Sequence, residues 1–410
     1  MHIKNKLIEN FFSLTVLRVL TLIVPLITFP YLIRILGSES YGAVMWAWSI
    51  VNFFILFINF GFNLSVTKYI AINRKNSDEV SKIVSTAIMT KVILFFISTV
   101  VFSLLVFSVP KMDEYSELFF LTFLLTIGET MMPIWYFQGI EQMKYTAIIT
   151  SFVKLFFTVL VFVVITEQDD YLKIPILYAV ASMLSALFAY YIIFYKHKIK
   201  IVKPRLQDII FYIKDSVALF FSSSISVIKD SLTIIFIENY VGLSAVAFFD
   251  IAQKFVNILL TPFHILSTVL FPHISKTKNF MLLKKAMIYT TIVGLFFVLL
   301  TYIFEESIVQ LLYGKSNEVV ESILYILSFS IVFANLASLL GTNGLVVAGE
   351  NKKLFLSSFY GFLFFIFILL LLIMFNKLDI LYVVYSILLA YMVDVLFRAW
   401  YMKGILLWQK

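Results

Sequence analysis

Charged side chains stand inside stretches of the sequence that are otherwise apolar, and they are the residues most able to do chemistry. A charge at the centre of a lipid bilayer costs about 3 kcal/mol on insertion scales, so such residues are usually paired or face water. Each is therefore a candidate for binding a ligand or coupling to an ion. The bases within apolar stretches are Arg18, Arg34, Lys68, Lys91, Lys154, Lys214, Lys229, Lys254 and Arg398, and the acids are Glu129, Asp215, Asp230, Asp250 and Asp394.

The bases in these stretches outnumber the acids, which favours an anionic ligand. Lysine and arginine are the usual partners of phosphate groups, so a pyrophosphate or an acidic sugar would suit such a site. Arg34, near the outer end of its stretch, is equally well explained as an interface anchor. We predict that the cations of a binding cavity are Arg18, Arg34, Lys154, Lys229 and Lys254.

Coupling to H+ or Na+ would require an acid without a permanent partner. Glu129, near the middle of its stretch, is the first candidate, followed by Asp230 and Asp250. Lys229 and Asp250 lie at similar depth in consecutive stretches, while Asp250 and Lys254 are four residues apart and share a helix face. These residues could form an ion-pair network that fastens two helices, or they could line a water-filled cavity. Both interpretations fit the sequence.

Asp394 and Arg398 are also four residues apart, and we predict a structural ion pair between them. The remaining residues contain no spacing typical of a metal site, a phosphate-binding loop or a nucleophile motif. The sequence has no cysteine and therefore no disulfide framework. We expect no metal, no cofactor and no enzymatic activity.

The apolar stretches that carry these charges are long enough to be transmembrane helices. The chain has 410 residues, of which 61% are hydrophobic and 14% are charged, whereas soluble domains are roughly 45–50% apolar. A membrane helix needs about 20 mostly apolar residues. The sequence therefore predicts an all-α integral membrane protein with about twelve spans, at 10–36, 41–66, 84–109, 116–138, 145–166, 172–194, 209–236, 243–271, 286–304, 322–348, 354–375 and 378–402. The tenth is the weakest, because Asn335, Gly341, Asn343 and Gly344 interrupt it.

The distribution of basic residues predicts the orientation of these spans. With twelve spans and the N-terminus inside, nineteen lysines and arginines fall in inside segments, and only Lys111, Lys173, Lys315 and Lys377 fall in outside loops. This asymmetry places both termini in the cytoplasm. It also accounts for the net charge of +8, so we expect no nucleic-acid partner.

A basic linker, residues 195–208, divides the chain into an N-terminal lobe at 1–194 and a C-terminal lobe at 209–410, with six predicted spans each. The linker holds Lys196, Lys198, Lys200, Lys203 and Arg205. Residues 31–47 resemble 236–252, aligned on Gly37 and Gly242, and residues 137–148 resemble 347–358 with one gap. Parallel repeats of this kind are related by an axis along the membrane normal, and the substrate site usually lies between them.

Four stretches resemble the Wzx-type O-antigen flippases. They are NFFSLTVLRVLTLIVPLITFPYLIRILGSESYG (10–42), NFGFNLSVTKYIA (59–71), PIWYFQGIEQMKYTAI (133–148) and AQKFVNILLTPFHILSTVLFPHIS (252–275). The resemblance implies the fold of the multidrug/oligosaccharidyl-lipid/polysaccharide (MOP) exporter superfamily, in which two six-helix lobes surround a central cavity that opens alternately to either side.

The same resemblance implies movement of undecaprenyl-pyrophosphate-linked oligosaccharide from the cytoplasmic to the periplasmic leaflet of the bacterial inner membrane. The expected partners are this substrate, membrane lipid, a coupling ion such as H+ or Na+, and a polysaccharide polymerase or chain-length regulator. The alternatives on the same fold are a MATE-like drug or cation antiporter and a lipid II flippase of the MurJ type. A membrane glycosyltransferase or polymerase is disfavoured, because such enzymes usually need a long outside loop.

Overall fold

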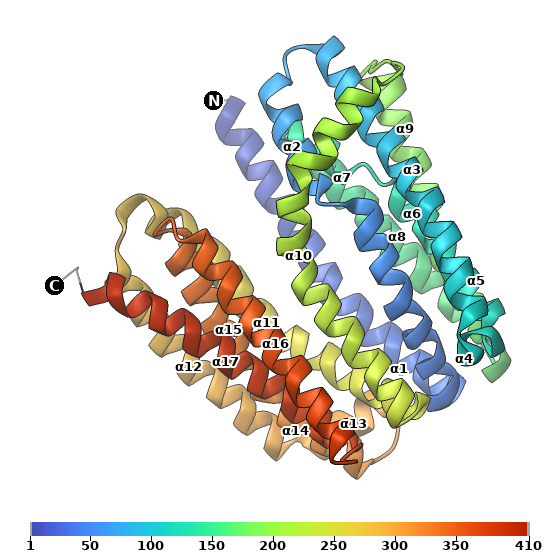
Figure 1. Ribbon diagram of the computed structural model, residues 1–410, viewed down its shortest axis with the longest axis vertical. Helices are drawn as coiled ribbons and strands as arrows, with labels where there is room; N and C mark the ends of the chain where they lie inside the picture. Colours follow the sequence, from blue (N-terminus) through green and yellow to red (C-terminus); the bar gives the residue numbers. More distant parts are fainter. Residues whose placement is uncertain (1, 408–410) are drawn as a thin grey trace. The chain divides into compact units, whose positions relative to one another are not determined.

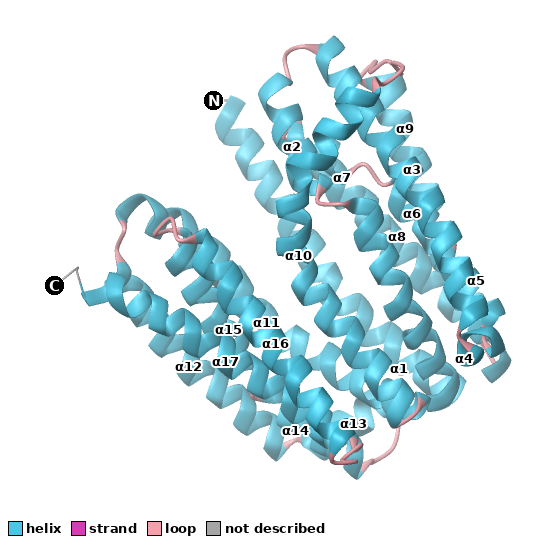
Figure 2. Ribbon diagram, viewed as in Figure 1, coloured by secondary structure: helices cyan, strands magenta, loops and turns pink. Residues whose placement is uncertain are grey.

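The computed structural model describes residues 2–407, and the side chains of all of these except 2–23, 25–26, 218, 222–223 and 404–407. The described residues form helices joined by short loops, and they contain no strand (Figure 2). Ten segments of the described residues are long and apolar enough to cross a membrane. The all-α membrane architecture predicted from composition is therefore confirmed.

The chain forms two compact units, Met1–Ile235 and Phe236–Lys410. The helices that begin in unit 1 are, in chain order (Figure 1), α1 (His2–Asn59), α2 (Phe62–Asn73), α3 (Ser77–Ser108), α4 (Pro110–Glu114), α5 (Ser116–Phe123), α6 (Leu125–Met131), α7 (Ile134–Gly139), α8 (Met143–Val164), the 3-10 helix η1 (Gln168–Leu172), α9 (Lys173–Tyr191), the π helix η2 (Ile192–Lys196) and α10 (Leu206–Tyr240).

Unit 2 contains the end of α10 and the remaining helices. These are α11 (Leu243–Thr277), α12 (Phe280–Ile303), α13 (Glu305–Tyr313), α14 (Glu318–Ser328), α15 (Ser330–Ser338), the π helix η3 (Leu339–Val346), α16 (Asn351–Met374) and α17 (Ile380–Leu407). Apart from α13, which covers a predicted outside loop, each lies over one of the predicted spans.

The internal repeat appears as matching breaks in the backbone. Gly37 interrupts α1 with φ 75° and ψ 167°, and Gly242 precedes α11 with φ 119° and ψ 172°. Only glycine adopts such angles readily. The two glycines aligned in the sequence therefore make the same kind of junction, each between two consecutive predicted spans.

The second pair of matched segments also shares a helix end. In the first, Glu141 is left-handed and its N–H donates to the Gln138 carbonyl. In the second, Gly349 is left-handed and its N–H donates to the Val346 carbonyl. Both are Schellman-type ends. In this geometry the residue equivalent to Gly349 is Glu141.

Two predicted spans are broken helices. The fourth is divided among α5, α6 and α7, with its last break at Met132 and Pro133. Proline disfavours a helical conformation for the residue before it, and Met132 is extended, with ψ 113°. The tenth is divided among α14, α15 and η3, over the segment that its glycines and asparagines already marked as interrupted.

Most of α10 belongs to unit 1. The hydroxyls of Ser65 on α2 and Ser216 on α10 lie 2.6 Å apart, and the ring of Phe60 stacks on that of Phe220 at 4.7 Å. A Cβ at Gly61 would lie 3.0 Å from the Phe220 backbone nitrogen, so the glycine permits this approach. The boundary between the units falls at residue 235, while the predicted division into lobes at the basic linker stays a prediction.

Gly128 permits close packing of α6 on α9. A Cβ at this position would lie 2.6 Å from the Cβ of Ser182 and 3.1 Å from its carbonyl carbon. Atoms in these positions cannot move aside without shifting a backbone. The packing is important for the site because Glu129, a candidate for ion coupling, is the next residue.

We expect Gly128→Ala to lower the midpoint of thermal unfolding of the detergent-purified protein, because overpacking of this kind typically costs about 1–3 kcal/mol. Ser182→Gly removes the nearest clashing atoms, so the double variant is expected to recover most of the loss. Ser182→Gly alone is the control. A double variant no more stable than Gly128→Ala would contradict the packing described.

Candidate functional site

Three of the four predicted cations of unit 1 lie on two neighbouring helices, α1 and α8. Lys154 is half-buried on α8, which packs on α1 through hydrogen-bond contacts between Thr28 and Thr158 Oγ1, at 3.1 Å, and from the Tyr31 hydroxyl to the Ile165 carbonyl, at 2.7 Å. Arg34 is exposed on α1. The α1 helix also carries Arg18, whose side chain lies outside the described residues.

Lys91 and Glu129 form a buried polar contact between α3 and α6. The Lys91 side chain is 2% exposed, and its Nζ donates to the backbone carbonyl of Glu129 at 3.3 Å. An ionised Glu129 carboxylate would also attract this ammonium. The sequence places Lys91 among the charges inside apolar stretches, but it is not one of the predicted cavity cations or candidates for ion coupling. The structure places it beside the first candidate for ion coupling.

Lys229 and Asp230 are consecutive residues of α10 in unit 1. Lys229 is half-buried and Asp230 is exposed, because adjacent residues of a helix point to different sides. Thr233 donates to the Lys229 carbonyl at 2.9 Å. Asp250 and Lys254 belong to unit 2, so the predicted proximity of Lys229 and Asp250 stays a prediction.

Asp250 and Lys254 pair one turn apart on α11 of unit 2. The Lys254 Nζ donates to Asp250 Oδ2, and the two side chains are 24% and 14% exposed respectively. The residues therefore share a helix face, as their spacing indicates. Neither an ion-binding nor a substrate-binding role follows from the pair alone.

Asp394 and Arg398 form an ion pair on α17, with Nη2 2.7 Å from Oδ2. The guanidinium also donates to Ser357 Oγ at 3.2 Å, to Ser358 Oγ at 2.8 Å and to the carbonyl of Ala337. These contacts join α17 to α16 and α15. A Cβ at Gly341 would lie 2.4 Å from Nη1, so this glycine makes room for the guanidinium.

Two buried asparagines provide further polar contacts within unit 2. Asn335 donates to Thr290 Oγ1 at 2.7 Å, and Asn343 donates to Ser267 Oγ at 2.6 Å. Asn335 is 2% exposed and Asn343 is 0% exposed. In the sequence they were read only as interruptions of a weak span. Their polarity within an apolar stretch was a signal that they form buried polar contacts, but this signal did not identify their partners.

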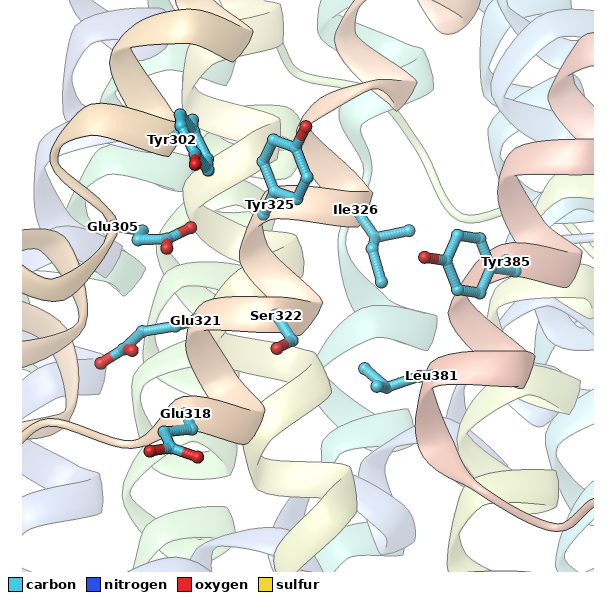
Figure 3. A pocket seen from close by; sticks show the side chains of 9 residues that line it. All are labelled: Tyr302, Glu305, Glu318, Glu321, Ser322, Tyr325, Ile326, Leu381 and Tyr385. Carbon is cyan, nitrogen blue, oxygen red and sulfur yellow. The ribbon is translucent and has the colours of Figure 1, made fainter.

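An acidic pocket of about 370 Å³ lies within unit 2. Three glutamates gather along one side in Figure 3, Glu305 on α13 and Glu318 and Glu321 on α14. Tyr302 and Tyr325 lie beside them, with ring centroids 5.1 Å apart. Glu321 Oε1 also accepts from the Asn317 N–H at 3.2 Å. The predicted topology places this end of the unit outside.

Glu305 gives this pocket a predictable pH dependence. Burial raises the pKa of Glu305, and the negative charge of Glu321 raises it further. The folded protein therefore holds this proton more tightly than the unfolded chain does. The resulting destabilisation is absent below about pH 4, where the carboxyl is protonated in both states. It develops as the pH rises through the raised pKa.

We therefore expect Glu305→Gln to raise the midpoint of thermal unfolding at about pH 8 and to leave it unchanged below about pH 4. Intrinsic fluorescence of the purified protein during heating provides the measurement. Glu114→Gln, which removes an exposed carboxylate of unit 1, is the matched control. An equal gain at both pH values would show that the carboxylate charge is not the cause.

Comparisons with known proteins extend over nearly the whole chain. The "Putative O-antigen transporter" of Escherichia coli strain K12 is 24% identical over 356 residues, covering 85% of this chain and 86% of that protein. A solved structure described as the inward-facing conformation of a multidrug resistance MATE family transporter of the MOP superfamily has a TM-score of 0.73 at 16% identity, covering 98% of this chain and 100% of that chain.

The lipid II flippase MurJ, in an inward closed conformation, has a TM-score of 0.72 at 16% identity, covering 97% of this chain and 87% of that chain. At these identities the likeness is one of fold, and the chain has the fold of the MOP superfamily. The sequence profile of the family described as "Polysaccharide biosynthesis protein" matches residues 7–278. Because this match covers more than half of the sequence, the chain belongs to the polysaccharide biosynthesis protein family.

Proposed function

We propose that the protein is a flippase for an undecaprenyl-pyrophosphate-linked oligosaccharide, such as an O-antigen repeat unit. It would move this substrate from the cytoplasmic to the periplasmic leaflet of the bacterial inner membrane. The observation that carries the proposal is the match, along 85% of the chain, to a relative named for O-antigen transport. The fold that the chain shares with a lipid II flippase supports it.

The mechanism follows from the cost of moving a charged headgroup through hydrocarbon. A pyrophosphate with attached sugars cannot cross unaided, because no water or fixed charge replaces its hydration there. We infer that cations of the spanning helices replace that hydration in a cavity. They are Arg18, Arg34, Lys154 and Lys229 of unit 1 and Lys254 of unit 2. The lipid tails stay in the bilayer, and rocking of the two halves exchanges access between its sides.

Ion coupling, to H+ or Na+, is assigned in this proposal to Glu129 first and to Asp230 and Asp250 next. The contact between Lys91 and Glu129 supports the order. A proton or Na+ that neutralises the carboxylate would weaken its attraction for the Lys91 ammonium and loosen α3 from α6. Asp250 differs in that its own carboxylate accepts the hydrogen bond of a lysine, Lys254, one turn away, whereas Lys91 donates to the backbone carbonyl of Glu129.

A drug or cation antiporter is the second candidate, favoured by the TM-score of 0.73 to a MATE transporter. The two candidates differ in the sign of the ligand charge. The excess of bases over acids in the spans, nine against five, favours the anionic ligand and therefore the flippase.

Deletion of the gene in the strain that carries it is expected to abolish surface polysaccharide while leaving drug sensitivity unchanged. Electrophoresis of the extracted polysaccharide and growth in the presence of cationic drugs provide the two readouts, and a plasmid copy of the gene is the control. Normal polysaccharide together with increased drug sensitivity would refute the flippase proposal and support the antiporter.

Alanine at Arg18, Lys154 and Lys254 together is expected to reduce surface polysaccharide at least tenfold, because the cavity would lose charges worth several kcal/mol of phosphate binding. Immunoblots of membranes verify insertion, and Lys154→Arg is expected to retain activity. The matched control is alanine at Lys111, Lys315 and Lys377, which removes the same charge from predicted outside loops. Normal polysaccharide in the first variant would refute the cationic cavity.

A further inference from the structure

The basic linker is fastened to unit 1 by its backbone. The Lys200 N–H donates to Ser81 Oγ at 3.0 Å, and the Val202 N–H donates to Ser85 Oγ at 2.9 Å. Ser81 and Ser85 are buried on one face of α3, so two turns of that helix hold an extended part of the linker. Ile199, which lies between η2 and Lys200 in the sequence, is only 7% exposed, so its packing anchors the same segment.

A second anchor lies at the start of the linker. The His197 Nδ1 and the Tyr136 hydroxyl are 3.0 Å apart, and the Lys196 ammonium lies 5.3 Å from the centroid of the Tyr145 ring. Burial lowers the pKa of His197, and the charge of Lys196 lowers it further. The imidazole is therefore neutral near pH 7, and its Nδ1 can accept a hydrogen bond from Tyr136.

The anchored linker presents cations and apolar side chains together. Its five basic residues are all exposed. Interleaved with them, Tyr195 is 76% exposed, Ile201 is 78% exposed, and Leu206 at the start of α10 is 70% exposed. A loop surrounded by water gains nothing from presenting such large apolar groups. The combination is typical of a segment lying in the interface between headgroups and acyl chains, where apolar groups insert and cations meet anionic lipid.

We propose that residues 195–206 form a binding site for anionic phospholipid headgroups at the cytoplasmic end of unit 1. Lys198, Lys200 and Lys203 contact lipid phosphates, while Ile201 and Leu206 insert between the headgroups. The inference goes beyond the proposed flippase activity, since it concerns bulk lipid of the cytoplasmic leaflet and not the transported substrate. The linker (Figure 1, between α9 and α10) would then fix the level of α3 and α9 in the membrane.

The insertion is tested with single cysteines, because the chain contains none. Ile201→Cys and Ser77→Cys each carry an environment-sensitive fluorophore on the full chain in vesicles. Ser77 is exposed at the start of α3 and has a polar side chain, so it is the control. With phosphatidylglycerol present, brominated acyl chains are expected to quench the label at 201 and not at 77. Equal quenching at both positions, or none at 201, would overturn the insertion.

The charge recognition is tested by titrating phosphatidylglycerol into the detergent-purified protein and following the midpoint of thermal unfolding. Glutamine at Lys198, Lys200 and Lys203 is expected to raise the lipid concentration needed for half of the stabilisation by about tenfold or more. Glutamine at Lys284, Lys285 and Lys352 removes the same charge from other exposed positions and is expected to behave as wild type. Identical shifts in the two triple variants would refute a specific role of the linker.

A last arm separates a lipid surface from a phosphate ligand. Inorganic pyrophosphate, with phosphatidylcholine as the only lipid, is expected to shift the unfolding midpoint equally in the wild type and in the variant with glutamine at Lys198, Lys200 and Lys203, because the proposed cavity is intact in both, whereas phosphatidylglycerol stabilises the wild type more. Added salt is expected to weaken the second effect, because exposed charges are screened. A pyrophosphate stabilisation that is lost in the glutamine variant would assign the linker cations to a phosphate ligand and overturn the proposal.

Discussion

A charge or polar group in hydrocarbon must find its partner inside the protein, and the rest of the structure depends on this constraint. The Lys91 ammonium meets it with the Glu129 carbonyl, and the Arg398 guanidinium meets it with a carboxylate, two serines and a carbonyl. Most of these partners lie on other helices, so satisfying the charge also fixes how the helices pack. Gly341 leaves the space that the Arg398 guanidinium occupies. The close packing of these helices and the pairing of this charge therefore depend on each other.

The arrangement of the helices follows from the sequence where it depends on local properties. Apolar length places the helices, and Gly37 and Gly242 mark equivalent junctions because both require a positive φ. Pro133 marks the break between α6 and α7. The attachment of α10 to unit 1 depends instead on contacts such as that of Ser65 with Ser216, 151 residues apart. Neither hydropathy nor charge distribution carries information about such a contact.

The candidate site residues also fall into two groups, those that local sequence predicts and those that depend on contacts between helices. Asp250 with Lys254, and Asp394 with Arg398, could be recognised because a spacing of four places two side chains on one helix face. Lys91 was overlooked because its partner is on another helix, 38 residues away. The buried asparagines of η3 and α15 were recognised only as disruptions for a similar reason. Sequence spacing detects pairs within a helix, whereas contacts between helices depend on packing.

The distribution of charge along the chain has a consequence for direction. Bases dominate the predicted inside segments and the spans, while Glu305, Glu318 and Glu321 gather at a pocket that the predicted topology places outside. If the proposed topology and substrate hold, a potential of this form would attract an anionic headgroup from the cytoplasmic side, hold it among the span cations and repel it at the outer end. It does not supply energy for net transport, since a fixed field is the same before and after a cycle. It would lower the chance that a released anion binds again from outside. For the proposed substrate, the charge distribution would therefore change the rates at which the headgroup is captured from the cytoplasmic side and recaptured from the outer side. Net movement would still require an ion gradient or removal of the product.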